Sequence, residues 1–343
     1  MMRTKIQKRL PAAPVTILLV ALPVVLFFAS FLLGKYPIPP LTVATILASK
    51  ILPVQHTWHS TLDTIIFQIR LPRMIAAMLV GAGLSISGAA FQGLFKNPLV
   101  SPQILGVGSG AGFGAALAIL LSGNAFMVQA SAFTFGIIAV SLTYGISRTY
   151  RATPTLVLVL AGIIVGALFS ALISLTKYVA DPYETLPSIV FWLMGSLASV
   201  SNRDLLVVLP PIVAGMIILL LIRWRINILA MGDEEAQALG VDTKKLTAII
   251  ILCATLITAS AVCISGIIGW VGLVIPHIGR MLVGPDHKYL LPASLLLGAS
   301  YLLLVDDLAR TLTTAEIPLG ILTAIVGAPF FAYLLRKSKV GWT

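Results

Sequence analysis

Residues 69–112 read IRLPRMIAAMLVGAGLSISGAAFQGLFKNPLVSPQILGVGSGAG, and nearly all of them are apolar or small. The only charged residues of this stretch, Arg70, Arg73 and Lys96, stand at the ends of long apolar runs. A helix needs about 20 apolar residues to cross the hydrocarbon core of a bilayer. The stretch therefore predicts two neighbouring membrane spans, over 70–92 and 104–121, joined by a short loop.

The composition of the whole chain agrees with this interpretation. Of its 343 residues, 58% are Ala, Val, Ile, Leu, Met, Phe, Trp, Tyr or Cys, and 10% are charged. A soluble domain has about 25% charged residues, and the mean hydropathy of +1.03 is too high for one. Low charge, aperiodic glycine and two cysteines exclude disordered, collagen-like and disulfide-scaffold classes. We therefore predict an all-α polytopic membrane protein with a single transmembrane domain over 1–343.

The hydropathy pattern predicts ten spans in the chain. They cover 15–34, 70–92, 104–121, 126–147, 156–177, 205–224, 246–265, 268–283, 292–310 and 319–336. A further apolar piece, 187–198, is too short to cross a bilayer, and we predict a short outer or re-entrant helix there.

The distribution of charge predicts the orientation of the spans. If the N-terminal segment 1–14 is cytoplasmic, the inside loops hold 16 of the 23 basic residues and five of the 12 acidic ones. The net charge of +11 then lies entirely on the inner side, as the positive-inside rule requires. Both termini are predicted to be cytoplasmic. The basic charge thus indicates attraction to the inner leaflet of a membrane rather than binding of nucleic acid.

Glycine recurs in LGVGSGAGFG, residues 105–114. On a helix, Gly106, Gly110 and Gly114 would share one face, and small residues at this spacing let two helices pack backbone to backbone. The segment is no phosphate loop, because no Gly-Lys-Ser/Thr follows it. The whole chain lacks GxxxxGK[ST], so we predict that it does not itself bind ATP in a P-loop.

Three arginines lie on the outer side, against the charge bias. Arg70 and Arg73 are three residues apart and would share a helix face. They are explained either by snorkelling to the membrane interface or by bidentate docking of an acidic partner. Arg310 is the third, and Asp306, one helical turn before it, is predicted to neutralise it.

The inside loop 225–245 contains NILAMGDEEAQALGVDTKK. We predict a short helix there, capped by Asp233, with Glu234 and Glu235 at its positive end and Gly240 terminating it. Such a helix is either a rigid handle for a partner or an ordinary solvated connector.

Signals for catalysis or metal binding are weak. His277 and His287 are ten residues apart and lack the HExxH spacing, so we expect structural histidines and no metal site. Pro276 is predicted to interrupt a helix. Cys253 and Cys263 lie in one apolar run and are predicted to be buried and unpaired.

Beside these local interpretations, several long segments resemble the permease subunits of the type II ABC importers for iron-siderophores, haem and cobalamin, the FecCD and cobalamin-type family. They are residues 69–112, FWLMGSL at 191–197, GDEEAQALG at 232–240, SGIIGWVGLVIPHIGRMLVGPDH at 265–287 and LVDDLARTLTTAEIPLGILTAIVGAPFFAYLL at 304–335. The resemblance covers about residues 60–336.

The resemblance implies an assembly in the inner or cytoplasmic membrane. Two ten-span copies would form a homodimer around the pathway, with two separate ATPase subunits inside and a periplasmic or lipid-anchored substrate-binding protein outside. ATP and Mg would bind the ATPases, so this subunit would hold no cofactor and would not be an enzyme.

The resemblance also assigns roles to residues. Arg70, Arg73 and Arg310 would face glutamates of the binding protein, and Asn97 and Leu99 would lie near the cytoplasmic gate. The positions that match the coupling helices are Ala230, Met231, Gly232, Asp233, Glu234, Glu235, Ala236, Leu239 and Gly240.

The cargo stays open at this point. Residues 97–102 read NPLVSP where many family members have Ala-Asp-Pro after NPL. The family suggests an iron-siderophore, haem or cobalamin, with a molybdate or tungstate-type oxyanion as the alternative. An ATP-independent secondary carrier is less favoured, because such carriers place coupling charges or broken helices at mid-membrane.

Overall fold

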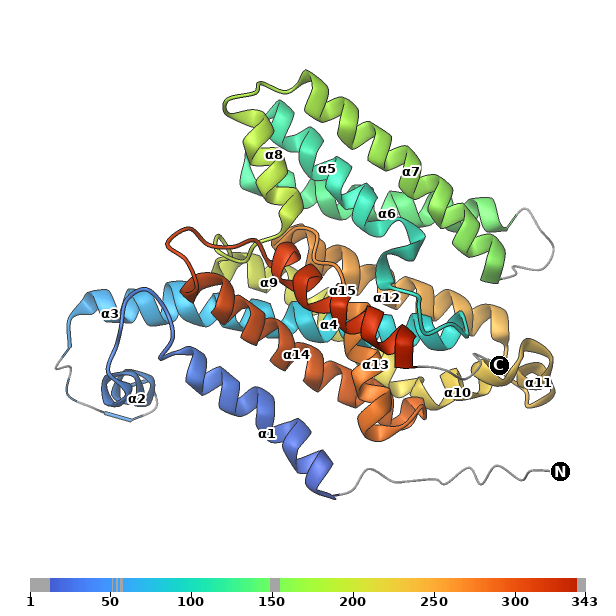
Figure 1. The fold of residues 1–343 in the computed structure, drawn as a ribbon, viewed down its shortest axis with the longest axis horizontal. Coiled ribbons are helices and arrows are strands. Elements are labelled where there is room, and N and C mark those ends of the chain that lie inside the picture. Colours follow the sequence, from blue (N-terminus) through green and yellow to red (C-terminus); the bar gives the residue numbers. More distant parts are fainter. Residues whose placement is uncertain (1–12, 51, 54, 56–57, 149–154, 338–343) are drawn as a thin grey trace.

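The computed structural model describes residues 13–50, 52–53, 55, 58–148 and 155–337 of the chain. In these ranges the regular elements are all helices, and they gather into one elongated bundle (Figure 1). Of the predicted cytoplasmic segment 1–14, residues 1–12 lie outside the described part.

Seven helices within these ranges are long and apolar enough to cross a membrane. One is a continuous 35-residue helix, Ser60–Leu94, in which α3 (Ser60–Thr64), the π-helical turn η1 (Ile65–Arg70) and α4 (Leu71–Leu94) follow each other. The other six are α1 (Ala13–Ser30), α6 (Ala125–Ser147), α7 (Thr155–Val179), α9 (Asn202–Leu221), α12 (Thr243–Ser265) and α14 (His287–Thr311).

Shorter elements complete the bundle. The apolar ones are α5 (Val107–Leu121), α8 (Thr185–Met194), α13 (Val271–Val283) and α15 (Leu319–Lys337). The remainder are α2 (Pro40–Ala48), the 3₁₀ turn η2 (Pro102–Leu105), α10 (Arg223–Met231) and α11 (Asp233–Ala238). Each of the ten predicted spans coincides with a helix, and the predicted short helix at 187–198 coincides with α8, so the all-α fold class is confirmed.

The predicted span 268–283 is corrected by the structure. Residues 266–270 are not helical, and α13 has only 13 residues, which gives a length of about 20 Å against a hydrocarbon core of about 30 Å. Gly266 and Trp270 both have φ of +67°. Irregular backbone is tolerated at membrane depth where protein surrounds it. Pro276, predicted to interrupt a helix, lies inside α13, and the break precedes that helix instead.

The central helix of the bundle is α4. Of the most apolar 18-residue window of its helix, 83% is buried, against 17% for the peripheral α1. A Cβ atom on Gly81 would overlap the carbonyl oxygen of Gly298 on α14, and one on Gly88 would overlap that of Gly272 on α13. Backbones thus touch where glycine permits it, as expected for helices in lipid.

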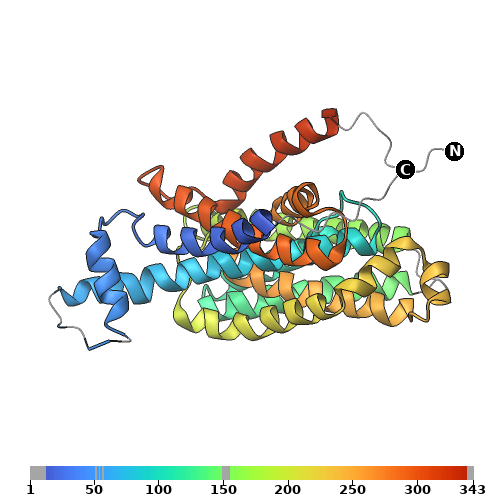
Figure 2. The same ribbon diagram turned by 90° about the horizontal axis from the view of Figure 1, so that it is seen from below.

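Helices α5, α6, α7 and α8 form a group along one side of the bundle, and α15 diverges from the rest (Figures 1 and 2). Gly110 and Gly114 of α5 face α6, where their Cβ atoms would overlap the carbonyl oxygens of Phe135 and Ser131. Gly106 does not share this helical face. It precedes α5 with φ of +83° and lies against α7, because the chain turns there out of η2.

Candidate functional site

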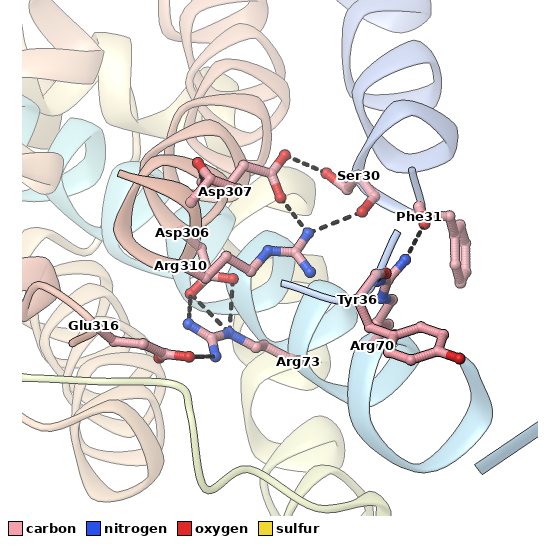
Figure 3. A network of polar contacts seen from close by, with 10 residues as sticks. Ser30, Phe31, Tyr36, Arg70, Arg73, Asp306, Asp307, Arg310 and Glu316 are labelled. Atoms are coloured by element: carbon pink, nitrogen blue, oxygen red, sulfur yellow. Dashed lines mark hydrogen bonds and ion pairs between the residues drawn. The ribbon is translucent and has the colours of Figure 1, made fainter. Parts of the chain in front are cut away.

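A network of buried charges lies where α4 begins and α14 ends, at the predicted outer end (Figure 3). The Arg73 guanidinium donates from Nε and Nη2 to both carboxylate oxygens of Asp306, and two of these distances are 2.9 Å. The Asp306 side chain is fully buried, and that of Arg73 is 8% exposed. A bidentate pair of this kind fixes α4 to α14 geometrically as well as electrostatically.

Arg73 also holds the segment that leads into α15. Its Nη1 lies 2.9 Å from Oε2 of Glu316, whose side chain is 29% exposed. One guanidinium therefore connects α4, α14 and the loop before α15.

The other two arginines hold the end of α1. Arg310 donates to the Asp307 carboxylate and, over 2.9 Å, to the carbonyl oxygen of Ser30. The Ser30 hydroxyl donates to the same carboxylate. Asp306 was predicted to neutralise Arg310, and this is wrong: Asp307 does so, because Asp306 points to α4.

Within the described residues, Arg70 is bound by backbone carbonyl groups. Its guanidinium donates to the carbonyl oxygens of Phe31 and Tyr36, which follow α1. As whole residues, Arg70, Arg73 and Arg310 are at most 7% exposed, so the snorkelling interpretation is wrong. Docking of a partner stays a prediction, and it requires at least one of these internal pairs to open.

A cavity of about 520 Å³ lies beside this network, among the predicted outer ends of α5, α6, α8 and α12. Glu316 lines it, together with Gln129 and Trp192. Three hydroxyl groups add to the lining, those of Ser188, Ser196 and Ser199. No lysine or arginine lines the cavity within the described residues. No local sequence pattern indicates this cavity, because its walls come from segments as far apart in the chain as Ile119 and Pro318.

A second site is the handle, α10 and α11, at the opposite end of the bundle (Figure 1). Asp233 was predicted to cap this helix, and this is wrong. Gly232 occupies the capping position, and Asp233 is the first residue of α11. Glu234 and Glu235 lie exposed in the first turn, where the helix dipole favours acidic groups. Ala236 is fully buried and fastens the helix to the bundle.

The end of α11 is sharply defined. Val241 N–H donates to the carbonyl oxygen of Ala236, and Gly240 N–H donates to that of Gln237. Gly240 has φ of +78°, the left-handed conformation that this termination needs. Asp242 then caps α12, and the Lys245 N–H that donates to it lowers the pKa of the Asp242 carboxyl.

The loop after α4 reaches this handle. Lys96 Nζ lies 3.8 Å from the Asp233 carboxylate. Asn97 Oδ1 accepts a hydrogen bond of 2.9 Å from Leu99 N–H, and both side chains are exposed. The structure thus brings Lys96, the neighbour of the predicted gate residue Asn97, beside the predicted coupling helix, although the two lie far apart in the chain.

The remaining candidates are structural. His287 is buried with Nδ1 2.8 Å from Asn227 Oδ1. Cys253 and Cys263 are buried and free, as predicted. Across the described residues, His, Cys, Asp and Glu form no cluster suited to a metal ion.

Within the described residues, seven helices of spanning length and four shorter apolar ones, with a network of buried charges at one end, define a polytopic membrane protein. The chain belongs to the FecCD transport family, whose model matches residues 21–337. It is 45% identical over 314 residues to the molybdate import system permease protein MolB of Haemophilus influenzae, covering 90% of this chain and 91% of that protein. Over 308 residues it is 41% identical to the cobalamin import system permease protein BtuC of Halobacterium salinarum, covering 90% and 81%.

A solved structure supports the same assignment. It is described as an inward-facing conformation of a metal-chelate type ABC transporter. Its chain superimposes with a TM-score of 0.82 at 44% sequence identity, over 93% of this chain and 97% of the other. The chain is therefore an ABC importer permease of the FecCD family.

Proposed function

We propose that this permease works as a homodimer that accepts cargo from a binding protein outside the cell and is driven by two ATPase subunits inside. The observation that carries the proposal is the handle. Helix α11 is exposed on all sides but one, sharply terminated at Gly240, and joined to the loop after α4 through Lys96. A rigid helix attached in this way would pass a displacement by the ATPase on to the membrane helices, whereas a flexible connector would absorb it.

The proposed mechanism is a shift between two packed states. ATP binding changes the shape of the ATPase pair and moves the handle, which lies against α4 through α10. Helix α4 reaches Arg73 at the other end, and Arg73 holds Glu316 before α15. Movement of the handle would thereby open or close the outer cavity. The bond-making chemistry of ATP hydrolysis belongs to the ATPase.

Docking of the binding protein is proposed at the same network. Glu316 is the most exposed carboxylate bound to Arg73. A glutamate of the binding protein would replace it on Arg73 and so release the loop before α15. Arg70 and Arg310 would complete the docking surface once the end of α1 moves.

For the cargo we propose a metal chelate of the iron-siderophore, haem or cobalamin class. The outer cavity supports this, because its lining offers hydroxyl, amide, aromatic and carboxylate groups and no cation in the part described. A bare oxyanion would be attracted by cations. The second candidate is a molybdate-type oxyanion, favoured by the 45% identity to a molybdate permease.

Transport can be measured with the permease, its ATPase and its binding protein in liposomes. Four probes are offered, namely a ferric siderophore, haem, cobalamin and molybdate. We expect ATP-dependent uptake of one of the first three, and no uptake without ATP. Uptake of molybdate alone would replace the proposed cargo and keep the importer. Uptake of any probe without ATP would contradict the importer itself.

The orientation has its own test. We place both termini and α11 on the cytoplasmic side. Because both native cysteines are buried, single cysteines introduced at the exposed positions Gln237 and Tyr183 can be labelled selectively. A membrane-impermeant maleimide added to intact cells should label Tyr183→Cys and spare Gln237→Cys, and the opposite pattern would invert the topology.

A further inference from the structure

A groove lies between α1 and α14 at the end of the bundle where α14 begins, and these two helices run side by side (Figure 1). Its volume is about 270 Å³. The lining is mostly apolar, and Leu19, Val283 and Ala293 in it are buried side chains that pack against each other. Arg223, Lys288 and Tyr289 also line the groove.

The two cations of the groove have no carboxylate partner in the described part of the chain. Lys288 Nζ lies 5.7 Å from the centre of the Tyr289 ring. The nearby Asp286 carboxylate accepts from the Asn227 amide and from the Lys288 backbone N–H. Asp286 does not line the groove and supplies one negative charge against the two positive charges of Arg223 and Lys288, so a net positive charge remains beside the apolar lining.

We propose that this groove binds an anionic phospholipid of the inner leaflet. Arg223 and Lys288 hold the phosphate, and one acyl chain lies between α1 and α14. Basic pockets between membrane helices on the cytoplasmic side suit anionic head groups. The groove also continues into a shallow apolar surface along α1, since Thr16 and Val20 line both. An acyl chain thus finds apolar contacts beyond the groove itself.

Charge distinguishes a lipid from the nearest alternative occupant. Residues 1–12 of this chain carry Arg3, Lys5, Lys8 and Arg9 and no acidic residue. A segment of this charge is repelled by Arg223 and Lys288, whereas an anionic lipid is attracted to all of them. The charges therefore favour a lipid over the chain's own N-terminal segment.

The test uses the full-length permease in nanodiscs of phosphatidylcholine with a minor share of phosphatidylglycerol, followed by native mass spectrometry of the retained lipids. The variant R223Q/K288Q removes both cations of the groove. The matched control, R225Q/K244Q, removes two exposed cations from the same side that do not line it. A third variant, Thr16→Trp, fills the groove from the exposed face of α1 without changing charge.

We expect R223Q/K288Q to retain about thirtyfold less phosphatidylglycerol than the unchanged permease, because each cation near the membrane surface raises the affinity for an anionic lipid roughly fivefold. Thr16→Trp should also lose it, and the control should retain it. Inorganic phosphate alone should not compete, because it lacks the acyl chain. Equal retention in R223Q/K288Q and the control, or full retention in Thr16→Trp, would overturn the proposal. Effective competition by inorganic phosphate would show a phosphate site and not a lipid site.

Discussion

The bidentate pair of Arg73 and Asp306 should be a principal source of stability at the outer end of the bundle. Asp306→Asn keeps the size of the side chain and removes its charge, so that among the described residues the buried Arg73 keeps Glu316 as its carboxylate partner. Removing one partner of a buried ion pair costs 3–5 kcal/mol, and because Glu316 remains we expect about 3 kcal/mol. This corresponds to roughly a hundredfold change in the ratio of folded to unfolded protein.

The assay is equilibrium unfolding in mixed detergent micelles, followed by tryptophan fluorescence. Glu316→Gln is the matched control: it also removes one carboxylate from Arg73, but that carboxylate is partly exposed, so we expect a loss of about 0.5 kcal/mol. Replacing both members of the buried pair, Arg73→Met with Asp306→Leu, should cost far less than the two single changes together. The stabilising role of the pair would be contradicted if the double change lost as much unfolding free energy as the two single changes added together. A loss below about 1 kcal/mol for Asp306→Asn would contradict it as well.

Three further changes test other parts of the structure. Gly110→Leu should separate α5 from α6 and reduce stability and dimer content on size-exclusion chromatography. Its control, Gly145→Ala, has open space around it and should be neutral or stabilising by up to about 1 kcal/mol. Gly240→Val should strain the left-handed end of α11 by about 1–2 kcal/mol and uncouple ATP hydrolysis from uptake; a normal ratio of the two rates would contradict the handle. Arg70→Glu with Arg73→Glu should weaken binding-protein docking and transport, and unchanged transport would eliminate the docking role.

Much of the fold could be predicted because hydropathy alone locates helices in lipid. Each predicted span has its helix, and the end of α11 follows from Gly240, since a left-handed termination depends on one local residue. The break before α13 could not be placed. Pro276 is the stronger local breaker, yet tertiary packing keeps α13 intact there and bends the chain at 266–270 instead.

The charge network could be predicted only in part. The sequence identifies the arginines by their unusual place on the outer side. Helical spacing favours ion pairs between residues one turn apart, and it therefore predicts a pair of Asp306 with Arg310. The partner of Arg73 lies 233 residues away in the chain, and only the packing of α4 against α14 brings the two together. The cavity and the lipid groove likewise arise from distant segments, and for that reason no local pattern indicates them.

Whether this permease works with a separate ATPase is tested by purifying the tagged protein from its native membrane in mild detergent and identifying the co-purifying proteins by mass spectrometry. We expect a P-loop ATPase at about one copy per permease. Repeated purification without an ATPase, from a preparation that still moves solute in liposomes, would contradict it and would indicate a self-contained carrier.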